Sequence, residues 1–497
     1  MMIKTIVTIA AVLTSSLAYA EGTARDAQGM LSRLGYQISV DGSWGPQSQR
    51  VIGQFYTDRG LTYDGTLSEN EFTDLSAEIA DLSVYVHLRS PYVDYSKTYE
   101  FPTEPWARVD DIQDYRERVF ATYGMRFWQM SNTSPTDPIC QREYQNFDVF
   151  RNLNLGNYDI SQHPKTRDLA ECLGSLDETI HLDVLKNGKN STLLKMFFED
   201  LISVWIANDA FNASRMRSLQ DNEDGGRGAS AGYAFVIDKI AFIYTSYAKY
   251  YGTSPSLDQG FREWWDARSQ DDEQKIYRPG WHLCKEFTLE KGFPAISGRD
   301  ECNNVAADYS TALAYMGMYY KDSDYINEAI FVAGTVARTT SPEGATIDAW
   351  RFGYALGYTI MVTHKLDETA LVLKGAGVNL YDMSFASHGA TVRDIIEWGA
   401  REYLNPDRIY LYACKHPQQL DGNATKRGLD CRTQNYSGVP PEDRLRYDTC
   451  SYRGMAGAMY QYPEFRDLMD NRTAIWNGWC GNDTMFNKYI LMRYFGG

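Results

Sequence analysis

The feature that most constrains the fold is a succession of amphipathic helical patterns between residues 193 and 404. Short loops of Gly, Pro, Ser and Asp separate these patterns, so consecutive helices are expected to pack as antiparallel hairpins. Each hairpin needs neighbours on both sides, and a series of them curls most simply into an α/α toroid or barrel. The expected fold class is therefore mainly α, with one strand pattern at 408–412. The helical segments are 193–211, 235–251, 305–320, 325–338, 347–364, 368–374 and 391–404.

The first twenty residues have the three parts of a secretory signal peptide. A basic start with Lys4 precedes an apolar run over 6–17, and Ala18 and Ala20 form the small-residue cleavage site before Glu21. This run is too short to span a bilayer, and no later stretch is long and uncharged enough to do so. We expect an exported protein, periplasmic or secreted and cleaved after Ala20, without membrane insertion.

The formal net charge of −16 restricts the partners. Nucleic acid is not expected, because phosphate binding needs a basic face. An acidic polysaccharide remains compatible, because salt screens surface charges beyond about 8 Å and a local cluster of Arg and Lys can still attract the polymer.

Eight cysteines in an exported chain indicate disulfides. Pairing neighbours in order is the simplest arrangement, although the sequence leaves other connectivities open. No pair has CxxC spacing, so a structural zinc site is not expected. The four neighbour pairs are Cys140–Cys172, Cys284–Cys302, Cys414–Cys431 and Cys450–Cys480.

Residues 21–80 form a candidate small helical module, followed by a candidate linker over 81–105. Two turn signals punctuate the module, at 41–46 and 64–67. The Asp-Gly-x-x-Gly-Pro element at 41–46 resembles the peptidoglycan-binding domain of the three-helix type. That resemblance implies a non-catalytic module that binds peptidoglycan or another glycan; the alternative is a spacing unit. Its expected core residues are Leu31, Leu34, Val51, Ile52, Phe55, Phe72 and Leu75.

The segment 302–358 carries the candidate chemistry. Asn303 and Asn304 stand at the start of one helical pattern. Arg351, Tyr354 and Tyr358 are spaced i, i+3, i+7 in a later pattern and would share one helix face. A guanidinium and a phenol facing an amide pair could act on the acidic carbon beside a carboxylate. The alternative is that the tyrosines pack in the core and the arginine forms an ordinary ion pair.

Several motifs between residues 193 and 404 resemble the alginate lyase family, whose fold is an (α/α) toroid. The resemblance implies β-elimination on poly-mannuronate, and it places the catalytic domain at 106–497, with a Cys-rich C-terminal segment. The family has an Asn-His pair where this chain has Asn303 and Asn304. The motifs are Phe261-Arg262-Glu263-Trp264-Trp265, Asn303-Asn304, the Arg351 and Tyr358 pair, 375–381 and 391–398. The histidines that could take the place of the family's histidine in space are His282, His364 and His388.

The expected mechanism needs donors that stabilise charge on a uronic-acid carboxylate. Asn303, Asn304 and Arg351 would supply them, with a two-pronged pair from the guanidinium. Free tyrosine titrates near ~10, and an adjacent arginine favours the phenolate, so Tyr358 could act as base and then as acid. No metal or other cofactor is expected.

Three further residues are expected to contact the polymer. They are Tyr354, Trp350 and Arg227, the last in a Gly-rich loop at 222–230 that is either a lid or a flexible connection. Two other functions stay open. One is a non-catalytic polysaccharide- or wall-binding scaffold. The other is a glycoside hydrolase, for which Asp308 and Asp348 are the candidate carboxylates.

Overall fold

A computed structural model describes residues 24–57, 62–76, 93–101, 192–209, 226–269, 284–287, 302–350 and 355–404, except 33, 35, 37, 69, 208 and 285. The chain divides into two compact units, Met1–Pro91 with Lys275–Leu283, and Tyr92–Gln274 with Cys284–Gly497. The two units are described separately below.

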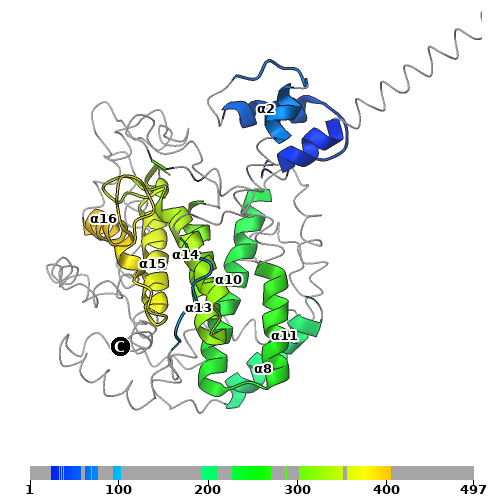
Figure 1. The fold of residues 1–497 in the computed structure, drawn as a ribbon. Coiled ribbons are helices and arrows are strands. Elements are labelled where there is room, and N and C mark those ends of the chain that lie inside the picture. The colour runs from blue at the N-terminus through cyan, green and yellow to red at the C-terminus, as the bar shows by residue number, and fades with distance from the viewer. Residues whose placement is uncertain are drawn as a thin grey trace, which may run out of the picture. The chain divides into compact units, whose positions relative to one another are not determined.

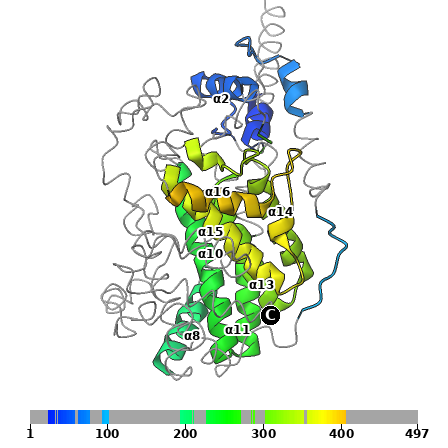
Figure 2. The ribbon, with the colours of Figure 1, turned by 90° about the vertical axis from the view of Figure 1, so that its left-hand side faces the viewer.

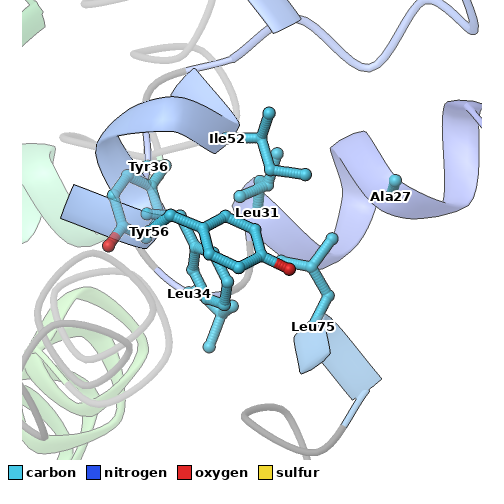
Figure 3. Packing of buried hydrophobic residues seen from close by; sticks show 8 residues of the cluster. Ala27, Leu31, Leu34, Tyr36, Ile52, Tyr56 and Leu75 are labelled. Atoms are coloured by element: carbon cyan, nitrogen blue, oxygen red, sulfur yellow. The ribbon is translucent and has the colours of Figure 1, made fainter. Parts of the chain in front are cut away.

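The N-terminal unit contains helical residues 24–32 and 70–76 together with α2, Pro46–Thr57. Their apolar faces meet in one core (Figure 3). All seven core residues predicted from the sequence belong to it, with Val51 and Phe72 partly buried at its margin. The buried residues are Ala27, Leu31, Leu34, Tyr36, Ile52, Phe55, Tyr56 and Leu75.

Gln28 organises the turn that carries the Asp-Gly-x-x-Gly-Pro element. Its amide nitrogen donates to Asp41 Oδ1 at 2.9 Å and to Ser48 Oγ at 3.0 Å, and its amide oxygen accepts from Gly42 N at 2.8 Å. Gly42 has φ +82°, a conformation that glycine adopts at low cost. The buried side chain therefore fixes the turn from inside the module.

The regular elements described in the second unit are all helices, apart from one isolated bridge between Ser384 and Thr391 (Figures 1 and 2). This agrees with the expected mainly α class, while closure into a toroid stays a prediction. The elements are α8 (Thr192–Ala207), α10 (Gly226–Tyr251), α11 (Pro255–Asp266), α13 (Asn304–Tyr320), α14 (Ser323–Ala337), η5 (Ile347–Trp350), α15 (Ala355–Lys374), η6 (Leu380–Asp382) and α16 (Val392–Leu404).

Three boundaries differ from the sequence-based expectation. The expected helices 347–364 and 368–374 are instead the 3₁₀ turn η5 and one continuous α15; Lys365 and Asp367, which lie between the two expected helices, are bonded inside the fold. α10 begins at Gly226, so the expected Gly-rich loop is wrong from that residue onward; tertiary context overrides the low helix propensity of glycine. α11 was not predicted, although its start carries a signal: Ser254 caps Leu257 N, and Pro255 follows.

α13 is the central helix of this unit. Every residue from Asn304 to Met318 is buried, and the helix packs against α10, α14 and α15 (Figure 1). α14 returns antiparallel after a left-handed residue, Lys321, with Ile326 of α14 against Gly317 of α13. The C-terminal end of α14 therefore lies at the level where α13 begins.

At the other end of α13, the carboxylate of Asp258 accepts hydrogen bonds from several tyrosine hydroxyls. Asp258 Oδ1 accepts from Tyr244 at 2.9 Å and from Tyr319 at 2.8 Å. Burial and then the Asp258 charge raise the pKa of both phenols above the usual tyrosine range. This network ties the C-terminal parts of α10 and α13 to the start of α11.

Residues 93–101, within the segment expected to be a linker, lie in extended form against α14 (Figure 2). Asn327 of α14 donates to Lys97 O at 3.2 Å and accepts from the Tyr99 hydroxyl at 2.8 Å. Because Asn327 is fully buried, this stretch is part of the packing of the helical unit.

Candidate functional site

A disulfide anchors the start of α13. Cys284 and Cys302 are bonded, with their Cα atoms 5.6 Å apart, which confirms one of the four expected pairs. The other six cysteines lie outside the described residues. The bond holds the chain immediately before the two asparagines.

Asn303 is the N-cap of α13. Its side-chain oxygen accepts from Val305 N at 2.9 Å, and the residue is buried. Asparagine is among the preferred residues at this position, because its short side chain satisfies a backbone N–H that the helix leaves free. The Asn303 side chain, expected to donate to a substrate carboxylate, thus uses its oxygen to hold the helix start.

Asn304 is the first residue of α13 and is only 2% exposed. Its Oδ1 is buried without a hydrogen-bond donor. An unmet buried polar group costs about 1–3 kcal/mol, so a donor from a ligand would relieve this cost. The free N–H groups and the dipole at the same helix end favour a negative charge nearby.

Tyr358 lies in the first turn of α15 and is half-buried. α15 runs parallel to α13: Lys365 Nζ is 2.6 Å from Asp308 Oδ1, and one turn further along both helices Thr369 Oγ1 is 2.9 Å from Thr311 Oγ1. Asn304 precedes Asp308 by four residues and Tyr358 precedes Lys365 by seven. The amide and the phenol therefore lie toward the same end of the helix pair.

The other expected site residues are only partly placed. Arg351 and Tyr354 lie outside the described residues, and Trp350 is the last residue of η5, with a side chain that is not among those described. Arg227 lies in the first turn of α10, and only its backbone is described. α10 is also parallel to α13, because Phe242 contacts Tyr315 and, further along both helices, Tyr244 contacts Tyr319. The first turn of α10 therefore points toward the end of the bundle where α13 begins.

Of the two candidate histidines within the described residues, His364 and His388, the latter lies toward this end. Its Nδ1 accepts from Ala390 N at 3.2 Å, so Nε2 carries the proton and donates to Thr340 O at 2.9 Å. Thr340 follows the C-terminal end of α14, which lies level with Asn303. Both ring nitrogens are bonded to backbone, so His388 is a structural histidine. His282 lies outside the described residues.

A carboxylate that the sequence analysis missed lies close by. Glu286, two residues after the disulfide-bonded Cys284, accepts from Ser387 N at 3.0 Å and from Ser387 Oγ at 2.5 Å. Burial raises the pKa of Glu286, but the Ser387 hydrogen bonds and the charge of Arg338 outweigh it and hold the pKa below its usual value. No local motif marks Glu286, because its partner is 101 positions away.

The carboxylates proposed for a hydrolase are enclosed in the fold. Asp308 is 2% exposed and Asp348 is 0% exposed. Asp308 is also paired with Lys365. A glycosidase needs two carboxyl groups that face a groove on either side of the bond, and this pair does not provide them.

A row of buried polar contacts lies between α13 and α15 and was not predicted. Lys365 Nζ also lies 3.3 Å from Glu368 Oε2, and the Tyr315 hydroxyl donates to Glu368 Oε1 at 3.0 Å. His364 Nε2 is 3.7 Å from the same Glu368 Oε2. Burial alone would lower the pKa of Lys365, but the charges of Asp308 and Glu368 raise it above the usual lysine value. A raised pKa favours the charged form of Lys365 near neutral pH, which is unsuited to the role of a base.

Comparison with known proteins gives little beyond this geometry. No protein-family model matches the chain, and no curated protein matches it. Among solved structures, the apo form of a histidine-to-alanine variant of alginate lyase A1-III aligns at 15% identity and a TM-score of 0.36, over 50% of this chain and 60% of its own length. The same variant with a tetrasaccharide aligns at 13% identity and a TM-score of 0.39, over 63% of this chain and 81% of its own. Likeness at these scores carries no argument for the activity of this chain, and the resemblance of residues 41–46 to a peptidoglycan-binding domain gains no support.

Within the part of the chain that the structure describes, no three His, Cys, Asp or Glu side chains are grouped to hold a metal ion. None of the described helices is long and apolar enough to cross a membrane.

Proposed function

We propose that this protein is a polysaccharide lyase that cleaves a uronic-acid polymer, such as alginate or poly-mannuronate, by β-elimination. The observation that carries the proposal is the parallel packing of α13 and α15. It brings the buried Asn304 amide and the N-terminal end of α13 to the same end of the bundle as the Tyr358 phenol.

The substrate carboxylate would bind at the start of α13. Elimination removes the proton on the carbon beside that carboxylate, so negative charge builds up on the carboxyl group, and donors fixed in advance lower the barrier. The helix dipole and the free backbone N–H groups of α13 favour such a charge. Arg351, four residues before α15 begins, would add a charged two-pronged contact. Tyr354, Trp350 and Arg227 would contact neighbouring sugars.

Tyr358 would transfer the protons. Its phenolate takes the proton from the carbon beside the carboxylate, the bond to the glycosidic oxygen breaks, and the phenol returns the proton to that oxygen. The reaction leaves an unsaturated sugar and consumes no water. This assignment fits the bonding of His388, since both of its ring nitrogens are hydrogen-bonded to backbone and neither is available as a base.

We also propose that the chain is exported after cleavage at Ala20, to the periplasm or the medium, and that residues 21–80 form a separate glycan-binding module with peptidoglycan as its candidate ligand. The compact core around Leu31 and Ile52 supports independent folding of that module. Weaker pull-down on cell-wall sacculi after its deletion, with turnover of a soluble polymer retained, tests the assignment.

The experiment for the catalytic proposal is a panel of polyuronates, scored for the ultraviolet absorbance of the unsaturated product. Tyr358→Phe keeps the ring and should lower turnover by about 10²–10⁴-fold, the usual loss for a general acid or base. Tyr354→Phe removes one hydroxyl from an expected sugar contact, so it should raise KM modestly and leave kcat nearly unchanged, whereas Arg351→Ala should weaken both binding and turnover.

Two outcomes would contradict the proposal. Normal turnover by Tyr358→Phe would remove the tyrosine mechanism. Tight binding of a polyuronate without any absorbing product would favour the non-catalytic scaffold. The argument for that alternative is that Asn304 stands where the alginate lyase family has a histidine.

A further inference from the structure

The interface between α13 and α15 is unusual for two central helices, because much of it is polar. Thr311 Oγ1 lies 2.9 Å from Thr369 Oγ1 and 3.2 Å from Lys365 O, and Ser310 Oγ lies 3.1 Å from Thr369 Oγ1. Beside these hydroxyls lie the three charges of Asp308, Lys365 and Glu368, here called the charged seam. Apolar side chains alone would bury this surface without such contacts.

The charged seam selects one axial register between the helices. A shift of one helical turn, about 5.4 Å, would carry the Lys365 ammonium away from Asp308 and leave both charges buried without partners. An unpaired buried charge costs several kcal/mol, whereas apolar contacts re-form after a small slide. Buried polar pairs are known to fix register between packed helices in this way.

The seam also lies close to the proposed site. Asn304 is one turn before Asp308 on α13, and Tyr358 is two turns before Lys365 on α15. Tyr358 and Lys365 lie on one continuous helix, so an axial slide of α15 at the seam also shifts Tyr358 relative to the start of α13. Misplacing a catalytic group by about 1 Å can cost roughly 10²-fold in rate.

We infer that Asp308, Lys365 and Glu368 are positioning residues, which set the register of α15 on α13 and so fix the axial position of Tyr358 relative to the start of α13. The catalytic part of this inference rests on the proposed lyase function, while the register itself does not. The three residues touch no substrate in this account. Their effect reaches the reaction through the two helices.

The test compares the wild-type seam with a neutral one, Asp308→Leu, Lys365→Met and Glu368→Gln together. This variant leaves no buried charge without a partner, and apolar replacement of buried ion pairs is often neutral for stability. The matched control, Glu397→Gln with Arg401→Met, removes an exposed ion pair on α16, where the side chains are 28% and 55% exposed.

The first readout does not depend on activity. Thr311→Cys with Thr369→Cys places two thiols where the hydroxyls are now 2.9 Å apart, and peptide mapping measures the bridged fraction. With the wild-type seam or the control, most molecules should be bridged. With the neutral seam, the bridged fraction should fall at least about tenfold, because a disulfide tolerates little displacement of its Cβ atoms.

The second readout is turnover of the polyuronate, measured without the added cysteines. The neutral seam should lower kcat by about 10²-fold with KM little changed, because the register affects the alignment of Tyr358 more than the binding of the polymer. Asp308→Asn, which is isosteric, serves as a second variant if the triple replacement fails to fold, and it should change both readouts in the same direction.

An unchanged bridged fraction with the neutral seam would overturn the register role. A lower bridged fraction with unchanged kcat would overturn the positioning role. A lower bridged fraction in a protein that turns over no polyuronate would leave the register role standing and refute the lyase proposal instead.

Discussion

Replacing Lys365 by methionine removes a charge from between two buried carboxylates and keeps an unbranched side chain of similar length. The ammonium lies 2.6 Å from Asp308 Oδ1 and 3.3 Å from Glu368 Oε2. The side chains of these carboxylates are 3% and 1% exposed, and that of Lys365 is 17% exposed, so the lysine is the main partner that offsets their burial. We therefore expect Lys365→Met to lower the free energy of unfolding of the helical unit.

The size of the loss follows from burial. Removing one partner of a buried ion pair costs about 3–5 kcal/mol, because the remaining charge stays buried. Lys365 serves two carboxylates, so the loss should lie near the upper end, about 5 kcal/mol. A domain of ordinary stability has about 5–15 kcal/mol in total, so this single change should be plainly visible.

Urea unfolding followed by far-ultraviolet circular dichroism measures the loss by linear extrapolation. Arg401→Met is the control, since Arg401 pairs with Glu397 on the surface of α16 and should lose only about 0–1 kcal/mol. Adding Asp308→Asn and Glu368→Gln to Lys365→Met should restore most of the stability, because the uncompensated charges disappear. A loss below about 1 kcal/mol for Lys365→Met alone would refute the reasoning, since it would mean that the carboxylates are neutral or hydrated in the fold.

Three other predictions follow from the packing and the titrating groups. Gly344→Ala should lower stability by about 2–4 kcal/mol, because the residue has φ +93° and an added Cβ would lie 2.4 Å from Asp394 O; Gly377→Ala, at φ +75° with open space around it, should lose clearly less in the same thermal melt. Removing the Cys284–Cys302 bond, which closes an 18-residue separation, should cost about 2–4 kcal/mol, and an unchanged melting curve for the double alanine variant would contradict this. The folded pKa of Lys365 is raised, so its contribution to the free energy of unfolding is complete below the unfolded pKa of about 10.4 and is lost as the pH rises through the folded pKa. The difference in stability between wild type and Lys365→Met should therefore narrow in strongly alkaline solution. A difference that widens there would be inconsistent with the ion pairs.

Local signals in the sequence predicted the starts of α8, α13 and α16 to within one residue and suggested one disulfide that the structure contains. Asn303 directly before an apolar helical run is a typical N-cap, and α13 begins one residue after it. Cys284 and Cys302 are neighbours among the cysteines, and the structure confirms their bond. The core of the N-terminal module could also be predicted from the sequence, because its apolar residues lie at helical spacing within one short stretch.

The arrangement of the site could not be predicted from local pattern. Lys365 and Asp308 are 57 positions apart, and each is a charged residue in a mostly apolar helical stretch. Only the packing of α13 on α15 makes them partners. Glu286 was missed for a similar reason, since its hydrogen bonds come from a loop 101 positions away. The shared helix face of Arg351, Tyr354 and Tyr358 stays a prediction, because the first two lie outside the described residues.

The central claim is that the polymer is cut by elimination, and the fate of solvent oxygen tests it most directly. Digestion of a polyuronate in water enriched in heavy oxygen, followed by mass spectrometry of the products, measures whether water enters the broken bond. For each bond cut, elimination by Tyr358 predicts one unsaturated product that is lighter by one water molecule than the corresponding hydrolysis product. In a digestion short enough that the new hemiacetal end has not exchanged its oxygen with solvent, neither product should carry heavy oxygen. One heavy-oxygen atom incorporated for each bond cut would contradict the account and identify the protein as a hydrolase.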